Sequence, residues 1–227
     1  TIINNYIQGK YMNKLMILGL FVMSLSPFAS AEWETSGFIG VQSEYFFRGE
    51  SQGDDRANQM GVHLENDSGL FGGVWVSEVG IYGNSNWEHD FYAGYKHNMS
   101  ENVDLYGGVI KYDFDHEWLK IGPDNNSDTV DLKEAYIGGS YKSVSLEHYV
   151  DLDNSELTYT EFGYDLPLGL AMIDLKMTWG LLNGDDDVLG LKATKAFGDW
   201  DISVMAMEHS RHGGRKEHSS FGIKYNF

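Results

Sequence analysis

The feature that most constrains this chain is a hydrophobic alternation with a period of two residues, which runs from about residue 35 to the last residue. In the final segment Phe221, Ile223 and Tyr225 fall on one face of an extended chain. Lys224 lies between them and falls on the other face. Successive side chains of a β-strand point to opposite faces, whereas an amphipathic helix repeats every ~3.6 residues. The pattern therefore predicts β-strands almost throughout.

Turn signals between the alternating segments predict twelve strands and a regular order of connections. Short connections alternate with longer ones, and transmembrane barrels combine an even strand number with short turns at one end and longer loops at the other. Strands of ~9–12 residues suit a tilted membrane crossing, whereas strands of soluble proteins average ~5–6 residues. These features predict an all-β, up-and-down antiparallel transmembrane β-barrel and argue against a soluble sandwich or lipocalin-like barrel. The expected strands are 35–48, 59–66, 70–79, 88–98, 103–113, 131–142, 144–152, 156–166, 170–181, 187–197, 200–208 and 218–227.

The first 31 residues are expected to lie outside the fold. Residues 12–31 read as a cleaved secretory signal peptide, because Lys14 precedes an apolar run and Ala29-Ser30-Ala31 supplies small residues at the cleavage site. The run 15–28 is shorter than the ~20 residues that a membrane-spanning helix needs. Residues 1–11 precede the first methionine and are expected to be an unstructured upstream extension. The barrel domain is then 32–227.

An exported barrel of this kind belongs in the outer membrane of a Gram-negative bacterium. With twelve strands, both termini lie on the periplasmic side, and Phe227 closes the last strand. Expected partners are outer-membrane lipids and lipopolysaccharide, together with the barrel assembly machinery, which would bind the C-terminal strand 218–227. The formal net charge of −18 argues against nucleic-acid binding, which needs a basic face. The sequence leaves the oligomeric state open.

If the apolar face meets lipid, the polar positions line the lumen, where two interpretations stay open. In one, water fills a narrow channel whose excess of acids attracts small cationic or neutral solutes. In the other, charges pair across the barrel and plug it, which leaves a structural or surface-recognition protein with acidic loops. Barrels of eight strands are filled and barrels of sixteen are open, so twelve lies between them. The expected channel-lining residues are Glu44, Arg48, Glu65, Lys96, Glu134, Glu147, Glu161, Asp174, Lys176, Lys192, Asp201 and Lys224.

Arg48 is the most informative of these residues. The alternation places it at the outer end of the first strand, beside Glu44 and with Lys224 of the last strand nearby. Its planar guanidinium can bind a carboxylate through two hydrogen bonds. It is expected either to contact a ligand at a constriction or to form a structural pair with Glu44 or a neighbouring strand.

Signals for catalysis and for metal binding are weak. A lipid-modifying enzyme is a third interpretation, but Ser145 and His148 fall on opposite faces of their strand and no Gly-x-Ser-x-Gly motif occurs. We therefore predict no catalytic residue, no cofactor and no dedicated metal site. Two loop clusters contain residue types that bind metals, but neither has the spacing of a dedicated site. The last external loop, expected to be solvated, contains His209, His212 and His218. The third external loop contains Asp113, Asp115, Glu117, Asp124 and Asp128.

A resemblance to a known family adds to this interpretation. The segment Ser43-Glu44-Tyr45-Phe46-Phe47-Arg48-Gly49-Glu50-Ser51-Gln52, followed by Ser68-Gly69-Leu70-Phe71-Gly72-Gly73, resembles the opening of the TorF-type porins. This proteobacterial family was long described as a domain of unknown function. The resemblance covers 32–227 and implies an outer-membrane location and a passive pore without an established substrate. The family has Pro-Ala in the first loop, where this chain has Arg56-Ala57.

Overall fold

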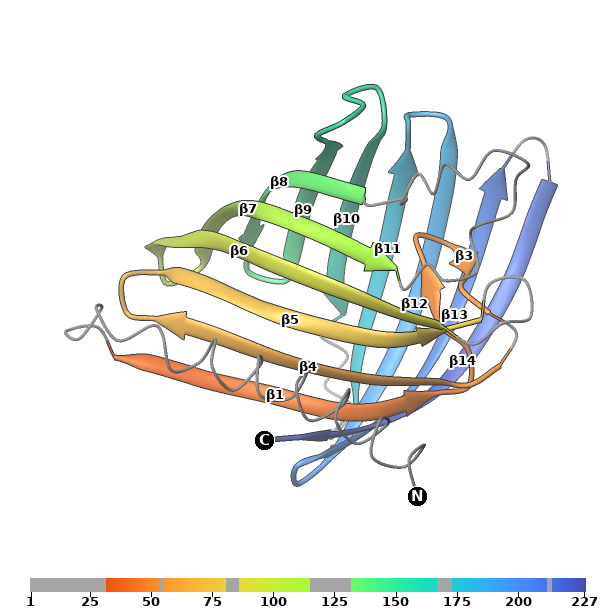
Figure 1. Ribbon diagram of the computed structural model, residues 1–227, viewed down its shortest axis with the longest axis horizontal. Coiled ribbons are helices and arrows are strands. Elements are labelled where there is room, and N and C mark those ends of the chain that lie inside the picture. The colour runs from red at the N-terminus through yellow and green to blue at the C-terminus, as the bar shows by residue number, and fades with distance from the viewer. Residues whose placement is uncertain (1–31, 54, 81–85, 115–131, 167–172, 212–213) are drawn as a thin grey trace, which may run out of the picture. The chain divides into compact units, whose positions relative to one another are not determined.

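Twelve antiparallel strands close into one barrel, in the ring order β1-β14-β13-β12-β11-β10-β9-β8-β7-β6-β5-β4 (Figure 1). The computed structural model describes residues 32–53, 55–80, 86–114, 132–166, 173–211 and 214–227. The predicted signal peptide and upstream extension lie outside these residues. In the described part, no helix is long and apolar enough to cross a membrane. The barrel strands are β1 (Trp33–Gln42), β4 (Ala57–Asn66), β5 (Leu70–Val79), β6 (Asn86–Ser100), β7 (Val103–Phe114), β8 (Leu132–Tyr141), β9 (Val144–Asp151), β10 (Thr158–Leu166), β11 (Asp174–Leu182), β12 (Asp186–Phe197), β13 (Trp200–Arg211) and β14 (Gly214–Asn226).

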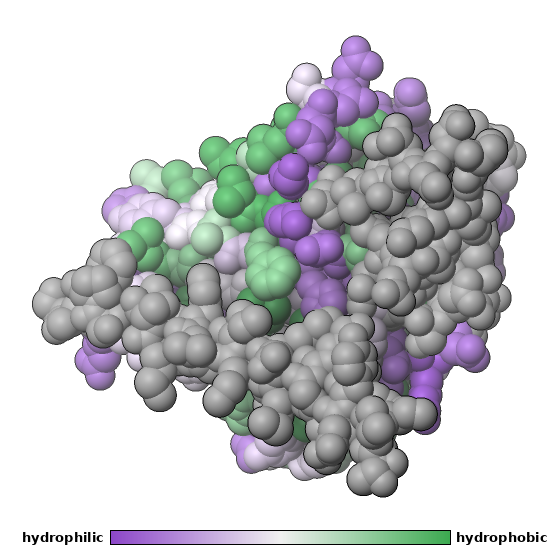
Figure 2. Space-filling view, in the orientation of Figure 1, coloured by the Kyte–Doolittle hydropathy of each residue, from purple (hydrophilic) through white to green (hydrophobic). Residues whose placement is uncertain are grey.

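The barrel has an apolar outer face and a polar inner face. Ile137 is 68% exposed and Leu146 is 54% exposed, although both are aliphatic. Glu134, an odd number of positions from Ile137 on β8, is only 2% exposed. Figure 2 shows hydrophobic residues gathered over the outer face of the strands at the left and hydrophilic residues towards the top. This arrangement is the reverse of a soluble protein and suits an outer surface that meets lipid.

The last strand closes the ring against the first. β14 pairs with β1, and Tyr225 stands opposite Ile39. Phe227 and Gly37 exchange two backbone hydrogen bonds of 2.8 and 3.0 Å. Trp200 packs on Tyr225 with ring centroids 5.1 Å apart, so aromatic side chains gather where the chain ends. The predicted pairing of the first and last strands is confirmed. Because the described ring is closed, none of its strands has an unpaired edge, and lipid could not supply hydrogen bonds to such an edge.

The two ends of the barrel differ. At the turn end, which also carries Trp33 and Phe227, the connections are 67–69, 101–102, 142–143, 167–173 and 198–199. At the loop end they are 43–56, 80–85, 115–131, 152–157, 183–185 and 212–213. The alternation of short and longer connections is confirmed as a tendency. Three connections are exceptions: 183–185 and 212–213 at the loop end are short, and 167–173 at the turn end is longer than the other turns.

Two expectations of the sequence are wrong at the loop end. The first strand ends at Gln42 and not at residue 48, because the chain leaves the wall and forms a separate two-stranded sheet, β2 (Phe46–Phe47) and β3 (Glu50–Ser51). His209 and His218 stand on β13 and β14, and His209 is only 2% exposed, so they do not belong to a solvated loop.

Candidate functional site: a hairpin inside the barrel

The β2–β3 hairpin lies within the ring of strands (Figure 1). Its turn is Arg48-Gly49, with φ of 48° and 86°. Two consecutive residues with positive φ define the tight turn that matches the natural twist of a β-hairpin. The Ser51 hydroxyl donates a hydrogen bond of 2.7 Å to Glu44, and the Gln52 amide donates one of 2.8 Å to the Tyr45 carbonyl. The hairpin is therefore an ordered element held by its own hydrogen bonds.

The tip of the hairpin is tied to a distant wall of the barrel. The Arg48 guanidinium donates two hydrogen bonds of 2.7 Å to the two carboxylate oxygens of Glu134 on β8. The side chains are 12% and 3% exposed, respectively. The Tyr112 hydroxyl donates a third hydrogen bond of 3.0 Å to Glu134. In the ring, β8 stands five strands from β1, so this pair spans the lumen.

Aromatic rings surround the Arg48 guanidinium on several sides. Its central carbon lies 4.4 Å from the Tyr159 ring centroid, 5.0 Å from that of Tyr149 and 4.7 Å from that of Phe47. Cations within ~6 Å of an aromatic face are attracted by the ring electrons. Burial alone would lower the pKa of Arg48, but the hydrogen bonds to Glu134 and nearby negative groups raise it above its ordinary value. Arg48 therefore remains a buried cation. We call Glu134, Tyr112, Tyr149 and Tyr159 the guanidinium cage.

The other flank of the hairpin packs on β12, β13 and β14. The Phe46 ring lies 4.8 Å from the His218 ring, centroid to centroid. A β-carbon built on Gly49 would lie 2.9 Å from Cβ of His209 and 3.0 Å from Val188. Only glycine fits this approach without a shift. Glu50 lies 3.7 Å from Nδ1 of His209. The hairpin thus touches walls on opposite sides of the ring and narrows the lumen at the loop end.

Tyr45, at the base of the hairpin, fixes it to a third wall. Its ring packs on Trp75 of β5 with centroids 5.2 Å apart. Burial, followed by the charges of Glu88 and Asp90, raises the pKa of the Tyr45 hydroxyl well above its usual value. Tyr45 therefore stays protonated and can donate a hydrogen bond to these inward-facing acids of β6.

The tyrosines of the cage continue into a network of further tyrosines and acids on β7 to β10. Tyr106 and Tyr149 each donate a hydrogen bond to Glu147, and the Tyr149 bond measures 2.7 Å. Tyr159 donates one of 2.8 Å to Glu161. The Tyr136 and Tyr149 rings stack with centroids 5.4 Å apart. These carboxylates accept hydrogen bonds from neutral donors, and no cation in the described part of the chain forms an ion pair with them.

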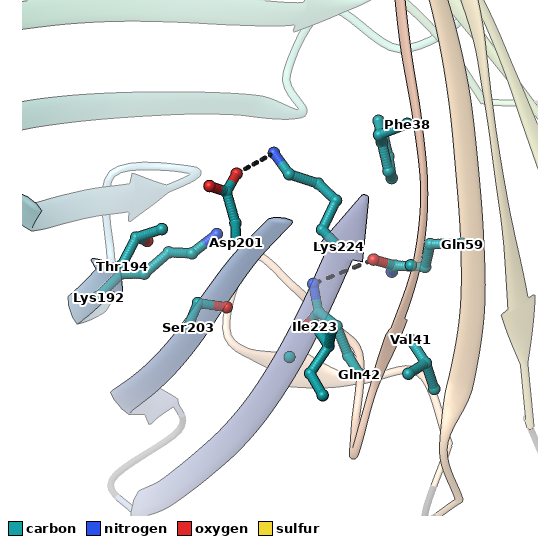
Figure 3. Close-up of a pocket in the computed structure, with 12 residues that line it drawn as sticks. Phe38, Val41, Gln42, Gln59, Lys192, Thr194, Asp201, Ser203, Ile223 and Lys224 are labelled. Atoms are coloured by element: carbon teal, nitrogen blue, oxygen red, sulfur yellow. Dashed lines mark hydrogen bonds and ion pairs between the residues drawn. The ribbon is translucent and has the colours of Figure 1, made fainter. Parts of the chain in front are cut away.

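A pocket of different character opens on the inner face of β1, β4, β12, β13 and β14 (Figure 3). Lys224 lies 3.3 Å from Asp201, and Lys192 extends towards the same carboxylate from the neighbouring strand. Gln42 donates a hydrogen bond of 3.0 Å to Gln59 on the opposite side. Lys192 is exposed although it faces inward, so water reaches this part of the interior. We call it the lysine pocket.

A family model described as a bacterial protein of unknown function, Gcw_chp, matches residues 27–213. The chain belongs to the Gcw_chp family. No curated protein matches it. Among the solved structures that are similar to it are a KdgM porin and a KdgM porin in complex with disordered oligogalacturonate. Each is 11% identical with a TM-score of 0.61 and covers 85% of this chain and 99% of its own. At this identity the likeness shows the fold alone, a closed barrel of twelve antiparallel strands.

In this member of the Gcw_chp family, ten of the twelve residues predicted to line the lumen stand at inward-facing strand positions. Glu44 and Arg48 do not, because both belong to the connection after β1. Arg48 pairs with Glu134 and not with Glu44, and Lys224 pairs with Asp201 and does not lie beside Arg48 in the way the alternation suggested. The ten inward-facing residues are Glu65, Lys96, Glu134, Glu147, Glu161, Asp174, Lys176, Lys192, Asp201 and Lys224.

Sequence reasoning missed the tyrosines of the cage and the role of His209. Tyr112, Tyr149 and Tyr159 occupy inward positions of the alternation, and that was the signal that could have found them. Alternation alone does not distinguish them from the many other inward tyrosines of the barrel. Gly49 is likewise a turn signal, because glycine adopts a positive φ at no steric cost.

The positions weighed for catalysis and metal binding lie apart. Nδ1 of His148 lies 2.9 Å from the Thr160 hydroxyl on the outer face, whereas Ser145 faces the lumen. In the part of the chain that the structure describes, no group of three or more histidines and acids could hold a metal ion. Asp113 is paired with Lys111 at 3.2 Å. The other acids of the third loop and His212 lie outside the described residues.

Proposed function

We propose that this chain is an outer-membrane channel for small cationic or neutral solutes, narrowed at its loop end by the β2–β3 hairpin. The observation that carries the proposal is a water-accessible, charged inner face inside an apolar outer face. Lys176 and Lys192 are exposed although both point into the barrel. Side chains that fill a closed core would be buried, so the exposure of these two lysines supports an interior at the turn end that water and small solutes enter.

The balance of inward charges supports a preference for cations. Within the residues that the structure describes, Glu147 and Glu161 accept hydrogen bonds from tyrosines and not from cations, so their negative field reaches the lumen. Arg48 is neutralised by Glu134, and Lys224 by Asp201. A lumen lined by an excess of one sign raises the local concentration of the opposite ion. Lys176 and Lys192 weaken this preference towards the turn end.

Further support comes from the sequence. The resemblance to the TorF-type porins agrees with a passive pore, and residues 12–31 have the composition of a signal for export. We place both termini in the periplasm, since the short turns share their end of the barrel. In this orientation the outer face meets lipid and the loops meet lipopolysaccharide, while strand 218–227 is the segment that the barrel assembly machinery binds.

Planar-bilayer recording of the refolded protein tests the proposal. We expect discrete conductance steps, and a reversal potential under a salt gradient that indicates cation preference. Heat-dependent migration in gel electrophoresis confirms folding in the same preparation. If a folded preparation carries no current over a wide voltage range, the channel proposal fails, and anion selectivity contradicts the expected sign.

A second candidate is a plugged barrel that acts in structure or surface recognition. The contacts of the hairpin with opposite walls favour it, since they leave less free space than the strand number alone suggests. Recording the Arg48→Ala variant separates the two candidates. A plug would give a silent native protein and a conducting variant, whereas a narrowed channel gives current in both.

A further inference from the structure

We propose that the guanidinium cage is a binding site for solutes that carry a guanidinium group, and that Arg48 occupies this site in the present structure as an internal ligand. The inference goes beyond the channel function, because it assigns a ligand class to side chains of the wall. It requires no ion flow, so the channel proposal and this one can fail separately.

The chemistry of the cage matches a planar, delocalised cation. Glu134 accepts two parallel hydrogen bonds of 2.7 Å, which is the fork geometry that guanidinium offers and ammonium does not. Tyr149 and Tyr159 present their rings at 5.0 and 4.4 Å, where a flat cation can stack on them. The Tyr112 hydroxyl holds one oxygen of Glu134 in place. These four groups specify shape as well as charge.

The cage belongs to the wall and not to the hairpin. Tyr112, Glu134, Tyr149 and Tyr159 come from β7, β8, β9 and β10, which are neighbours in the ring. Their positions are fixed by strand pairing, whereas Arg48 arrives from a separate segment. Removing the Arg48 side chain therefore leaves a formed site with a buried, unpaired carboxylate. Such a carboxylate is costly, and a guanidinium ion from solution would restore its partner.

In the native protein the solute must compete with Arg48. A tethered group acts at an effective concentration in the millimolar range, so the native site binds external ligand more weakly than a site without Arg48. When a solute occupies the cage, the tip of the hairpin loses its tie to β8. Binding then releases one of the contacts that narrow the lumen, because the cage holds either the ligand or Arg48 but not both.

The experiment measures the thermal unfolding midpoint of Arg48→Ala in detergent, titrated with methylguanidinium chloride and, in parallel, with methylammonium chloride at equal ionic strength. We expect methylguanidinium to raise the midpoint with half-saturation in the millimolar range, and methylammonium to have little effect. In the double variant Arg48→Ala/Glu134→Gln, the half-saturating concentration should rise at least about tenfold, as expected when a buried charge loses its partner.

Arg48→Gln is the second variant, in case Arg48→Ala does not fold. It keeps a side chain of similar length without the charge and should respond to methylguanidinium in the same way. Equal responses to the two cations, or an unchanged response after Glu134→Gln, would overturn the proposal. A barrel that binds methylguanidinium but carries no current would leave this inference standing and remove the channel function alone.

Discussion

The two halves of the barrel interior are built differently. At the loop end, the β2–β3 hairpin and the guanidinium cage form a packed layer, in which Arg48 and Glu134 are 12% and 3% exposed. Towards the turn end, Lys176 and Lys192 face inward and yet are exposed to water. At the loop end the buried polar groups form hydrogen bonds and ion pairs with each other, whereas at the turn end inward lysines are exposed to solvent.

This difference shows how the width of the lumen can be controlled in a barrel of intermediate size. Wall side chains fill a barrel of about eight strands, but a ring of twelve strands is wider. Narrowing then needs a segment from outside the wall, and the connection after β1 supplies it. The wall provides strength through backbone pairing, while the bore depends on a few side-chain contacts at Arg48 and Gly49. The two properties should therefore respond to different substitutions.

The largest effect should come from Arg48→Ala. It leaves Glu134 buried without its cation, which costs about 3–5 kcal/mol, so urea unfolding in detergent should show lower stability and recordings should show larger conductance. Arg215→Ala is the matched control, because its pair with Glu208 is on the surface, where Arg215 is 70% exposed. That substitution should cost at most about 1 kcal/mol. Equal losses in both variants would mean that the cross-barrel pair has no special role.

Gly49→Ala should have the next largest effect. The backbone at Gly49 has a φ of 86°, and a β-carbon there would lie 2.9 Å from His209. A left-handed conformation costs a non-glycine residue about 1–2 kcal/mol, and the crowding adds to this. Gly198→Ala shares the positive φ of 62° but meets nothing within 4 Å, so only the conformational cost applies. Unfolding measurements should rank Gly49→Ala as the more destabilised, and the reverse order would contradict the close packing of the tip on β13.

The smallest effect should come from the open half. Lys192→Gln removes an inward cation and should raise cation preference by roughly twofold, since a unit charge at about 8 Å in water is worth about 0.5 kcal/mol. Lys195→Gln is the control on the outer face, where the Lys195 ammonium lies 5.0 Å from the Phe197 ring. Reversal potentials under a salt gradient compare the two variants. If the reversal potential shifts in Lys195→Gln and not in Lys192→Gln, the conducting surface is not the inner face that carries Lys192.

Much of the wall could be predicted from the sequence because strand pairing is encoded locally. The alternation marks which residues face lipid, and the pairing of β14 with β1 follows from closure. The end of the first strand was missed, since residues 43–48 keep alternating after the chain has left the wall. Alternation reports an extended backbone and does not say which sheet the strand joins.

The site depends on contacts that no local pattern contains. Arg48 and Glu134 are 86 residues apart, and a single sequence offers no means to match them. In the sequence, His209 stands among polar side chains and therefore looks like a loop residue. In the structure, β13 extends to Arg211 because it pairs with β14 and because the hairpin packs on it, and no local pattern contains these contacts. Inward tyrosines were visible in the pattern, but their convergence on one guanidinium required the closed ring.

The most direct test of the account asks whether the tip of the hairpin packs against β13 inside the barrel. The chain has no cysteine, so Gly49→Cys/His209→Cys introduces one possible disulfide. The Cβ positions lie 2.9 Å apart, slightly below the about 3.5–4.5 Å of a disulfide, so a small shift suffices. We predict that mild oxidation cross-links the folded protein and fixes a low conductance, and that a reductant raises it. A folded variant whose two thiols react freely with maleimide and form no cross-link would contradict the account.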